Sequence, residues 1–173
     1  MTPQTDLGRY VEIDGRPAVR LVRRLPHPPE RVWAAVTEPS EMAHWFPSAV
    51  TIDPRPGGAM TFADDPNMPP SSGTVLEYDP PRRCAFSWGE DEVHLDVEPG
   101  QDGGSVLTLT NVLDARDAAA RNAAGWTVCL DELTAALDGG GSGGPHSDDA
   151  EPWRPVYDAH VAAGLPHGAA IPG

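Results

Sequence analysis

His94 and Asp96 are the residues whose types and spacing most directly suggest chemistry. They project from the same side of a predicted strand, and a His-x-Asp pair could supply two ligands to a metal ion. No third or fourth ligand stands at a suitable spacing, and Val93, Leu95 and Val97 occupy the other face of that strand. We therefore expect His94 to face solvent, and we assign no metal ligands.

Cys84 and Cys129 are the only cysteines, too few for a disulfide framework. A cysteine nucleophile needs a base within hydrogen-bond reach, and neither cysteine has a histidine neighbour in the sequence. We expect both to be small buried hydrophobic residues. We assign no catalytic residue.

Three other polar stretches have structural explanations. "GGGSGGP" (139–145) lacks the Gly-Lys-Ser/Thr ending and the preceding strand of a phosphate-binding loop, so its composition is typical of a linker. "GEDE" (89–92) and "HSDD" (146–149) are expected to be solvated turns. The sequence therefore implies no cofactor.

The composition narrows the possible partners. Among 173 residues, 12 are basic and 26 are acidic, which gives a net charge of -14. Such a charge repels phosphate backbones and anionic membrane surfaces, so we expect neither nucleic acid nor membrane as a partner. The first residues show no secretory signal pattern, and no apolar stretch reaches the roughly 20 residues of a membrane span. We expect a cytoplasmic protein with reduced thiols, either a monomer or a weak homodimer.

The elements that would position these residues are mainly strands. Short alternating runs at even spacing, with turn residues between them, imply an antiparallel sheet. Two short helices interrupt the strands, one starting at Pro28-Pro29 and one at about 40–46. The expected strands are 10–13, 18–25, 49–52, 59–62, 73–78, 83–88, 93–98 and 105–112.

A long helix is predicted from residue 114 to about residue 137. Trp126, Leu130, Leu133 and Leu137 recur there at helical spacing. A helix of this span is roughly 36 Å long, enough to cross a whole sheet. Gly125 lies mid-helix, where glycine costs about 1 kcal/mol relative to alanine but allows the close approach of a neighbour.

The chain divides at the end of this helix. We expect one domain over 1–138, a flexible linker over 139–149, and a helix with a disordered end over 150–173. The apolar stripe of that last helix consists of Trp153, Val156, Tyr157, His160 and Val161. An isolated helix of this length is unstable in water, so we expect the stripe to dock on its own domain, and docking beside the opening helices would make it part of a lid.

Four stretches, in order, resemble a known family. "PPERVWAAVTEPSEMAHWFP" resembles its opening helices, and "PGGAMTF" resembles its Gly-Gly hairpin. "GTVLEYDPPRRCAFSW" resembles its strand, proline turn and Trp-ended strand, and "GWTVCLDELTAAL" resembles its C-terminal helix. The family is the START-like, SRPBCC-type group related to the activator of heat-shock-protein-90 ATPase, as found standing alone in bacteria. The resemblance spans about residues 18–138.

The resemblance implies an α+β helix-grip fold, in which a curved antiparallel sheet wraps around a long C-terminal helix and two short helices close one end. Trp33 would anchor the first helix to the sheet, while Trp45 and Phe46 would line or cover a cavity. Apolar walls with few polar groups suit a binding pocket. The residues expected to line it are Trp33, Trp45, Phe46, Phe62, Leu76, Phe86, Trp88, Leu95, Leu109, Trp126 and Leu130.

We therefore expect non-catalytic binding of a small hydrophobic or aromatic molecule between sheet and helix. One alternative is an enzyme resembling polyketide cyclases or dehydratases, which would place a buried Asp, Glu, His or Tyr in the cavity. Many relatives carry His near Asn111, and asparagine cannot act as a general base, which argues against acid–base chemistry there. Another alternative is contact with a chaperone, because the eukaryotic namesake domain stimulates a chaperone ATPase.

Overall fold

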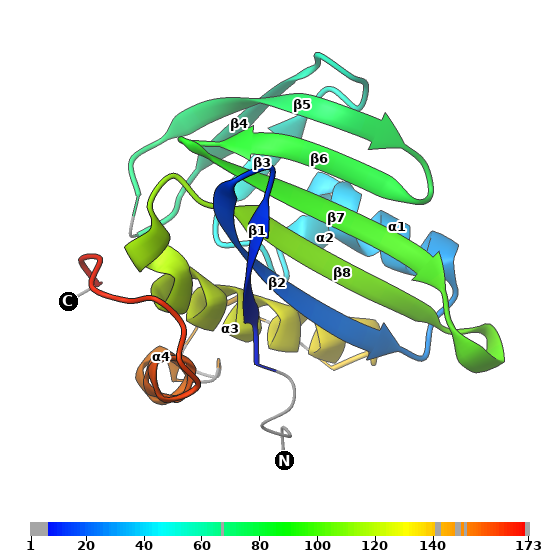
Figure 1. Cartoon of the computed structure of the whole chain (residues 1–173). Helices are drawn as coiled ribbons and strands as arrows, with labels where there is room; N and C mark the ends of the chain where they lie inside the picture. The colour runs from blue at the N-terminus through cyan, green and yellow to red at the C-terminus, as the bar shows by residue number, and fades with distance from the viewer. Residues whose placement is uncertain (1–6, 67, 141–142, 148–149, 151, 172–173) are drawn as a thin grey trace.

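An eight-stranded antiparallel sheet curves around the long helix α3 (Ala119–Leu137) (Figure 1). The computed structural model of the chain describes residues 7–66, 68–140, 143–147, 150 and 152–171. The strand order is β1-β2-β8-β7-β6-β5-β4-β3, so β3 to β8 form a meander and β2 joins it at β8. The strands are β1 (Arg9–Ile13), β2 (Arg16–Leu25), β3 (Ala49–Ile52), β4 (Ala59–Ala63), β5 (Ser71–Asp79), β6 (Arg83–Trp88), β7 (Asp91–Pro99) and β8 (Ser105–Val112).

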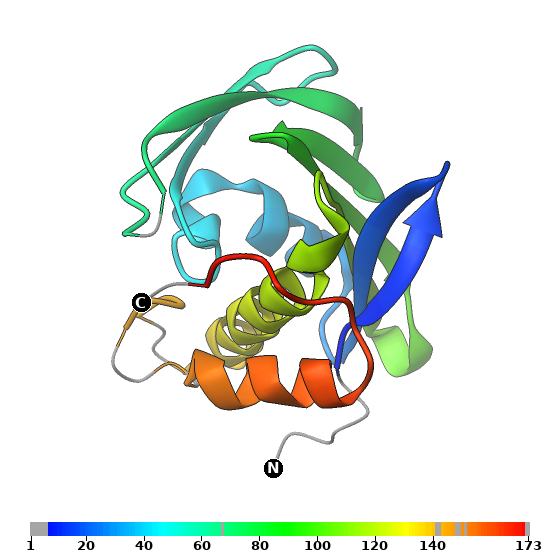
Figure 2. The same ribbon diagram turned by 60° about the vertical axis from the view of Figure 1, so that its left-hand side comes forward.

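The helices complete the α+β helix-grip fold, as the sequence predicted. Helices α1 (Pro29–Thr37) and α2 (Pro39–Met42) lie with α3 on the concave side of the sheet (Figures 1 and 2). Short 3-10 turns, η2 (Gln101–Gly103) and η3 (Arg116–Ala118), precede β8 and α3. None of the described helices has the length and hydrophobicity that a membrane span requires.

Tryptophans hold the two short helices in place. The Trp33 ring lies 5.6 Å from the Tyr78 ring of β5, which fixes α1 against the sheet. Trp45 Nε1 donates a 2.9 Å hydrogen bond to the Ala35 carbonyl, which ties the end of α2 back to α1. The second helix is shorter than expected and ends at Met42, so Trp45 and Phe46 lie in the turn that follows it.

Helix α3 begins five residues later than the sequence pattern indicates. The Leu113 amide still donates to the Pro17 carbonyl of the sheet, and the Asp114 amide donates to Asp91 Oδ1 at 2.8 Å. These bonds keep the chain extended past the end of β8. Residues 114–118 fit the helical period, but before α3 starts they form only the short turn η3.

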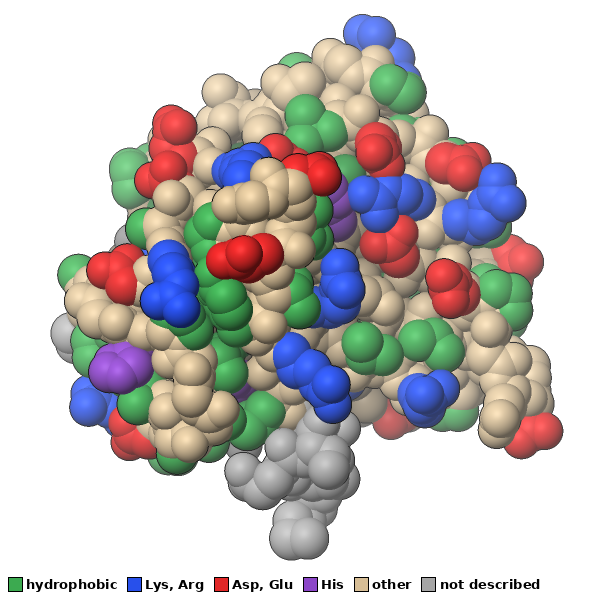
Figure 3. Space-filling view, viewed as in Figure 1, with side chains coloured by type: hydrophobic (Ala, Val, Ile, Leu, Met, Phe, Trp, Pro, Cys, Tyr) green, Lys and Arg blue, Asp and Glu red, His purple; other side chains and the backbone are tan. Residues whose placement is uncertain are grey.

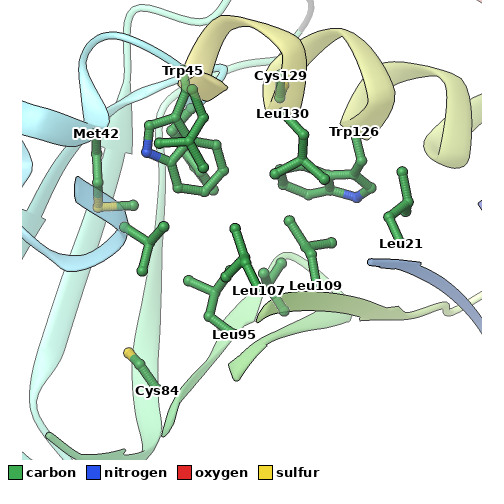
Figure 4. Close-up of a cluster of buried hydrophobic side chains, with 14 of the residues drawn as sticks. Leu21, Met42, Trp45, Cys84, Leu95, Leu107, Leu109, Trp126, Cys129 and Leu130 are labelled. Atoms are coloured by element: carbon green, nitrogen blue, oxygen red, sulfur yellow. The ribbon is translucent and has the colours of Figure 1, made fainter. Parts of the chain in front are cut away.

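The core fills the space between α3 and the sheet. Trp45, Trp126 and Leu130 lie over the inward-pointing leucines of β7 and β8 (Figure 4). Cys84 of β6 lies on the same inner face and is 1% exposed. This position agrees with the alternation of inward and outward residues along β6. Burial raises the pKa of the Cys84 thiol to about 12, and the charge of Arg83 opposes this shift only partly.

The C-terminal helix α4 (Trp153–Ala162) packs on α3, on the side that faces away from the sheet (Figure 2). This agrees with docking on the same domain. It does not lie beside the opening helices; the segment before it approaches the end of α2, where His146 Nε2 donates to the Pro47 carbonyl at 3.0 Å. Part of the predicted linker, at 141–142 and 148–149, lies outside the described residues.

The expected disorder of 164–173 is wrong for residues 164–171. Leu165 is buried, and the Pro166 carbonyl accepts a 2.9 Å hydrogen bond from the Ala120 amide at the start of α3. Arg121 donates to the Ala170 carbonyl at 3.0 Å. The first turn of a helix has unpaired amides, and this segment satisfies one of them. Backbone pairing, which composition does not reveal, therefore orders the segment.

His160 fastens α4 to the beginning of β1. Its side chain is completely buried: Nε2 accepts the Gly8 amide at 2.9 Å, and Nδ1 donates to the Val156 carbonyl at 2.8 Å. These two bonds require the neutral ring. Burial lowers the pKa of His160, the bond to Val156 opposes that shift, and the charge of Arg23 adds to it.

We therefore expect the free energy of unfolding to fall as the pH drops below about 6.5, the ordinary histidine pKa. In that range the unfolded chain binds a proton that folded His160 resists, so acid favours unfolding, whereas the full stability is present above it. Urea titrations between about pH 7.5 and pH 5.5 measure this dependence. His160→Gln should flatten it, while His44→Gln, at an exposed position, should not. Equal slopes in all three proteins would contradict this role of His160.

Candidate ligand-binding cleft

Phe46 is the centre of an aromatic cluster between α3 and the sheet. Its ring centroid lies between 5.6 and 6.0 Å from those of Phe62, Phe86, Trp88 and Trp126. Trp88 and Trp126 also contact each other, with centroids 5.2 Å apart. The cluster occupies the space that the sequence had assigned to a central cavity.

The structure divides the eleven predicted wall residues into three groups. Trp88 and Trp126 border a cleft at the end of the aromatic cluster. Leu76 is 43% exposed and lies outside the core. The remaining eight are packed in the core: Trp33, Trp45, Phe46, Phe62, Phe86, Leu95, Leu109 and Leu130.

Leu76 was assigned to the wrong face of β5. The pairing of β5 with β6 shifts between Val75 and Glu77, which marks a β-bulge. Val75 faces inward opposite Phe86 and is 1% exposed. Because the bulge adds one residue to β5, the next residue that faces inward is Tyr78. Two adjacent apolar residues do not reveal which one faces the core, and the bulge changes the alternation between them.

The cleft has a volume of about 880 Å³, within the range of small-molecule sites. Five parts of the chain surround it: the loop after α2, the β4–β5 loop, the β6–β7 turn, the N-terminal half of α3, and the segments at the two ends of α4. The lining residues that carry the following argument are Asp65, Trp88, Glu90, Asp91, Asn122, Gly125, Trp126, Cys129, His146 and Trp153.

A buried polar network holds one wall of the cleft. Asn111 of β8 is completely buried; its Oδ1 accepts from Trp126 Nε1 at 3.0 Å and from Asn122 Nδ2 at 2.9 Å. Its Nδ2 donates to Asp91 Oδ2 at 3.0 Å and to the carbonyls of Glu92 and Val112. Asn122 Nδ2 also reaches Asp91 Oδ2 at 3.3 Å. These bonds fix the orientation of the Trp126 indole.

This network gives Asn111 a structural role in place of an acid–base one. An amide both donates and accepts, so Asn111 can bridge the Asp91 carboxylate and the Trp126 N–H at the same time. The Asp91 carboxylate receives hydrogen bonds from two side-chain amides and from the Asp114 amide. Its oxygens therefore stabilise the junction of β7, β8 and α3.

The two tryptophans of the aromatic cluster differ in the hydrogen bonding of the indole N–H. Trp126 Nε1 donates to Asn111. Trp88 Nε1 is buried and has no hydrogen-bond partner among the residues that the structure describes. A buried donor without a partner typically costs about 1–3 kcal/mol. Trp88 borders the cleft, but Nε1 itself has almost no accessible surface.

The thiol in the cleft wall is not activated. Cys129 is 3% exposed, and burial raises the pKa of its thiol, with the charges of Asp65 and Glu132 adding to the shift. The thiolate is the nucleophilic form of cysteine, and a raised pKa makes it scarce at neutral pH. Cys129 therefore contributes an apolar surface to the cleft.

His94 lies on the outer face of the sheet, away from the cleft. Its Nδ1 accepts from Arg83 at 2.6 Å and its Nε2 donates to Glu92 at 2.9 Å, so both ring nitrogens are occupied. Arg83 also pairs with Asp96 at 2.7 Å. Basic and acidic side chains lie next to one another over this face (Figure 3). Within the described ranges, no group of three or more His, Cys, Asp or Glu could hold a metal ion.

Comparison with known proteins identifies the family. The model of the family "Activator of Hsp90 ATPase homolog 1-like protein" matches residues 26–138, which is more than half of the chain. The chain belongs to this family. The match contains both short helices, the strands from β3 to β8, and all of α3.

Solved structures of similar proteins extend this finding. The crystal structure of CalU16 from Micromonospora echinospora is 25% identical and has a TM-score of 0.68, with 90% of this chain and 92% of that chain covered. DynU16, from the dynemicin biosynthetic locus, is 25% identical, with a TM-score of 0.62 over 70% of this chain and 47% of that one. EF2215 from Enterococcus faecalis, of unknown function, shares the fold at 14% identity and a TM-score of 0.72. No curated protein matches the chain.

The structural similarity to CalU16 extends into the C-terminal segment of this chain, beyond the family match. The family match ends at residue 138, and residues 1–138 are less than 90% of the chain. Coverage of 90% must therefore include residues beyond Asp138. Part of this segment therefore belongs to the fold that the two proteins share.

Sequence reasoning missed the polar and C-terminal walls of the cleft. "GEDE" is not simply a solvated turn, because Glu90 is exposed but Asp91 belongs to the buried network. Pro145, His146 and Ser147 line the cleft although their composition indicates a linker. Gly125 was the one available signal: a Cβ built there would meet Trp153 Nε1 at 4.0 Å, so α4 is the neighbour that approaches it.

Proposed function

We propose that this protein binds a small, flat, apolar molecule without chemical conversion, in the cleft beside Trp88 and Trp126. The observation that carries the proposal is the cleft of about 880 Å³ that Trp88 and Trp126 border at the end of the aromatic cluster. Aromatic walls favour a flat, apolar ligand, because such a molecule stacks on the rings.

Two observations favour binding over catalysis. The Asp91 carboxylate accepts hydrogen bonds from Asn111, Asn122 and the Asp114 amide, so this network sets its position. Cys129 has a raised thiol pKa. Asp91 and Cys129 therefore serve the shape of the cleft.

Titration with 2-(hydroxymethyl)naphthalene tests the proposal, because this probe is flat, neutral and carries one acceptor oxygen. Calorimetry should give saturable binding at one site. In nitrogen–proton spectra the Trp88 indole N–H should shift, while that of Trp45, already bonded to the Ala35 carbonyl, should not. Trp88→Phe identifies the Trp88 signal. Absence of saturable binding, or equal shifts at both indoles, would refute the proposal.

Gly125→Ala is expected to separate stability from binding. The built Cβ meets only Trp153 Nε1, at 4.0 Å, which is an ordinary contact. Removing a mid-helix glycine should therefore raise the free energy of unfolding by up to about 1 kcal/mol. The added methyl group projects toward the cleft and should weaken probe binding several-fold. Higher stability with unchanged affinity would show that the bound probe does not lie beside Gly125.

A further inference from the structure

The cleft combines aromatic rings with negative charge. Three of the chain's five tryptophans line it, together with three carboxylates. These residues are Trp88, Trp126, Trp153, Asp65, Glu90 and Asp91. Tryptophan faces attract cations, and carboxylates in a partly dry site attract them more strongly than in water.

The charge of the lining is not balanced by its basic residues. Arg121 is the one arginine among the described lining residues, and three carboxylates against one guanidinium leave a net charge of -2 with His146 neutral. Arg121 donates to Asn122 Oδ1 and to the Ala170 carbonyl, which are neutral acceptors. Arg121 therefore holds the C-terminal segment and does not pair with the carboxylates of the cleft.

The three carboxylates differ in their availability to a ligand. Asp91 is engaged in the network with Asn111 and Asn122. The Asp65 side chain is only 6% exposed and lies 3.6 Å from His146 Nε2. Glu90 is exposed in the β6–β7 turn and forms no ion pair with any described residue. Glu90 is therefore the carboxylate best placed to meet a charged group at the mouth of the cleft.

We propose that the ligand of this cleft is a protonated amine attached to a flat apolar body. The inference rests on the proposed binding function and adds the charge of the ligand to it. The apolar body lies against Trp88 and Trp126, while the ammonium group lies near Glu90 and the Trp153 side of the cleft. An anionic molecule of the same shape is repelled by the net charge of the lining.

Three matched probes test the charge preference: 2-(aminomethyl)naphthalene, 2-(hydroxymethyl)naphthalene and 2-naphthoate. Their ring is identical and their charges at neutral pH are positive, zero and negative. We expect the amine to bind roughly tenfold more tightly than the alcohol, and the carboxylate to bind most weakly. The preference for the amine should shrink as salt concentration rises, because Glu90 is exposed and its field is screened.

Glu90→Gln should weaken amine binding by roughly two- to fivefold and leave alcohol binding unchanged. Glu98→Gln is the matched control, because it makes the same charge change at an exposed position farther along β7. The two positions are eight residues apart, roughly 26 Å of strand. Equal losses in both variants would attribute the effect to the overall acidity of the chain and overturn the inference.

The remaining outcomes distinguish this inference from the binding function. If the alcohol binds as tightly as the amine, the cleft binds apolar molecules but has no preference for cations, and only this inference fails. If none of the three probes binds, the proposed function fails and this inference fails with it.

Discussion

Trp126→Ala should lower the free energy of unfolding by about 3–5 kcal/mol, as the truncation of large core aromatics does. Trp126 is 3% exposed and packs between Phe46 and Trp88, so its loss would leave a cavity at the centre of the aromatic cluster. Its Nε1–H also satisfies Asn111 Oδ1. The variant loses the ring contacts and this hydrogen bond together.

Urea titration of two further variants separates these contributions. Trp126→Phe keeps most of the apolar volume but removes the donor to Asn111, and it should lose less than the alanine variant. Trp153→Ala removes a tryptophan that is only partly buried, and we expect a loss of about 1 kcal/mol. A loss below about 1 kcal/mol for Trp126→Ala would mean that α3 does not pack through this face.

The strands were predictable because their signals are local. Alternation along β7 and β8, and turn residues such as Asp14-Gly15, place the strand ends within a few residues of the observed bounds. Trp126 and Leu130 were predictable as inward-facing because the helical period fixes their face relative to one another. The resemblance then supplied the order in which these elements pack.

The cleft was less predictable because its walls meet only in three dimensions. Asp91 and Asn111 are 20 residues apart, and Asn111 and Asn122 are 11 residues apart, with no spacing rule joining them. A helical stripe such as that of α3 does not distinguish a cavity wall from solid packing. Most of the predicted wall residues therefore lie in the core, and the cleft opens at the end of the aromatic cluster.

Truncation after Asp138 is expected to lower both stability and probe binding. It removes α4, in which Val156 and His160 are buried, and it removes Leu165 from the surface of α3. Burying apolar side chains such as Val156 and Leu165 contributes about 1.5–3 kcal/mol each before the cost of ordering the segment, so we expect a net loss of at least about 2 kcal/mol. For a chain of this length that corresponds to a fall in melting temperature of roughly 4–8 °C.

The effect on binding follows from the shape of the cleft. His146, Trp153 and Ile171 line it, and truncation would open that side to water and remove the Trp153 ring. We expect the affinity for the amine and alcohol probes to fall at least roughly tenfold, a loss of about 1.4 kcal/mol. Val156→Ser in the full chain should loosen α4 and reproduce part of both effects, while Ala162→Ser, at an exposed position of the same helix, should reproduce neither. If the truncated chain keeps its melting temperature, oligomeric mass and probe affinity, and Trp153 of the full chain fluoresces as a solvated indole, the C-terminal segment contributes nothing to the fold or the cleft.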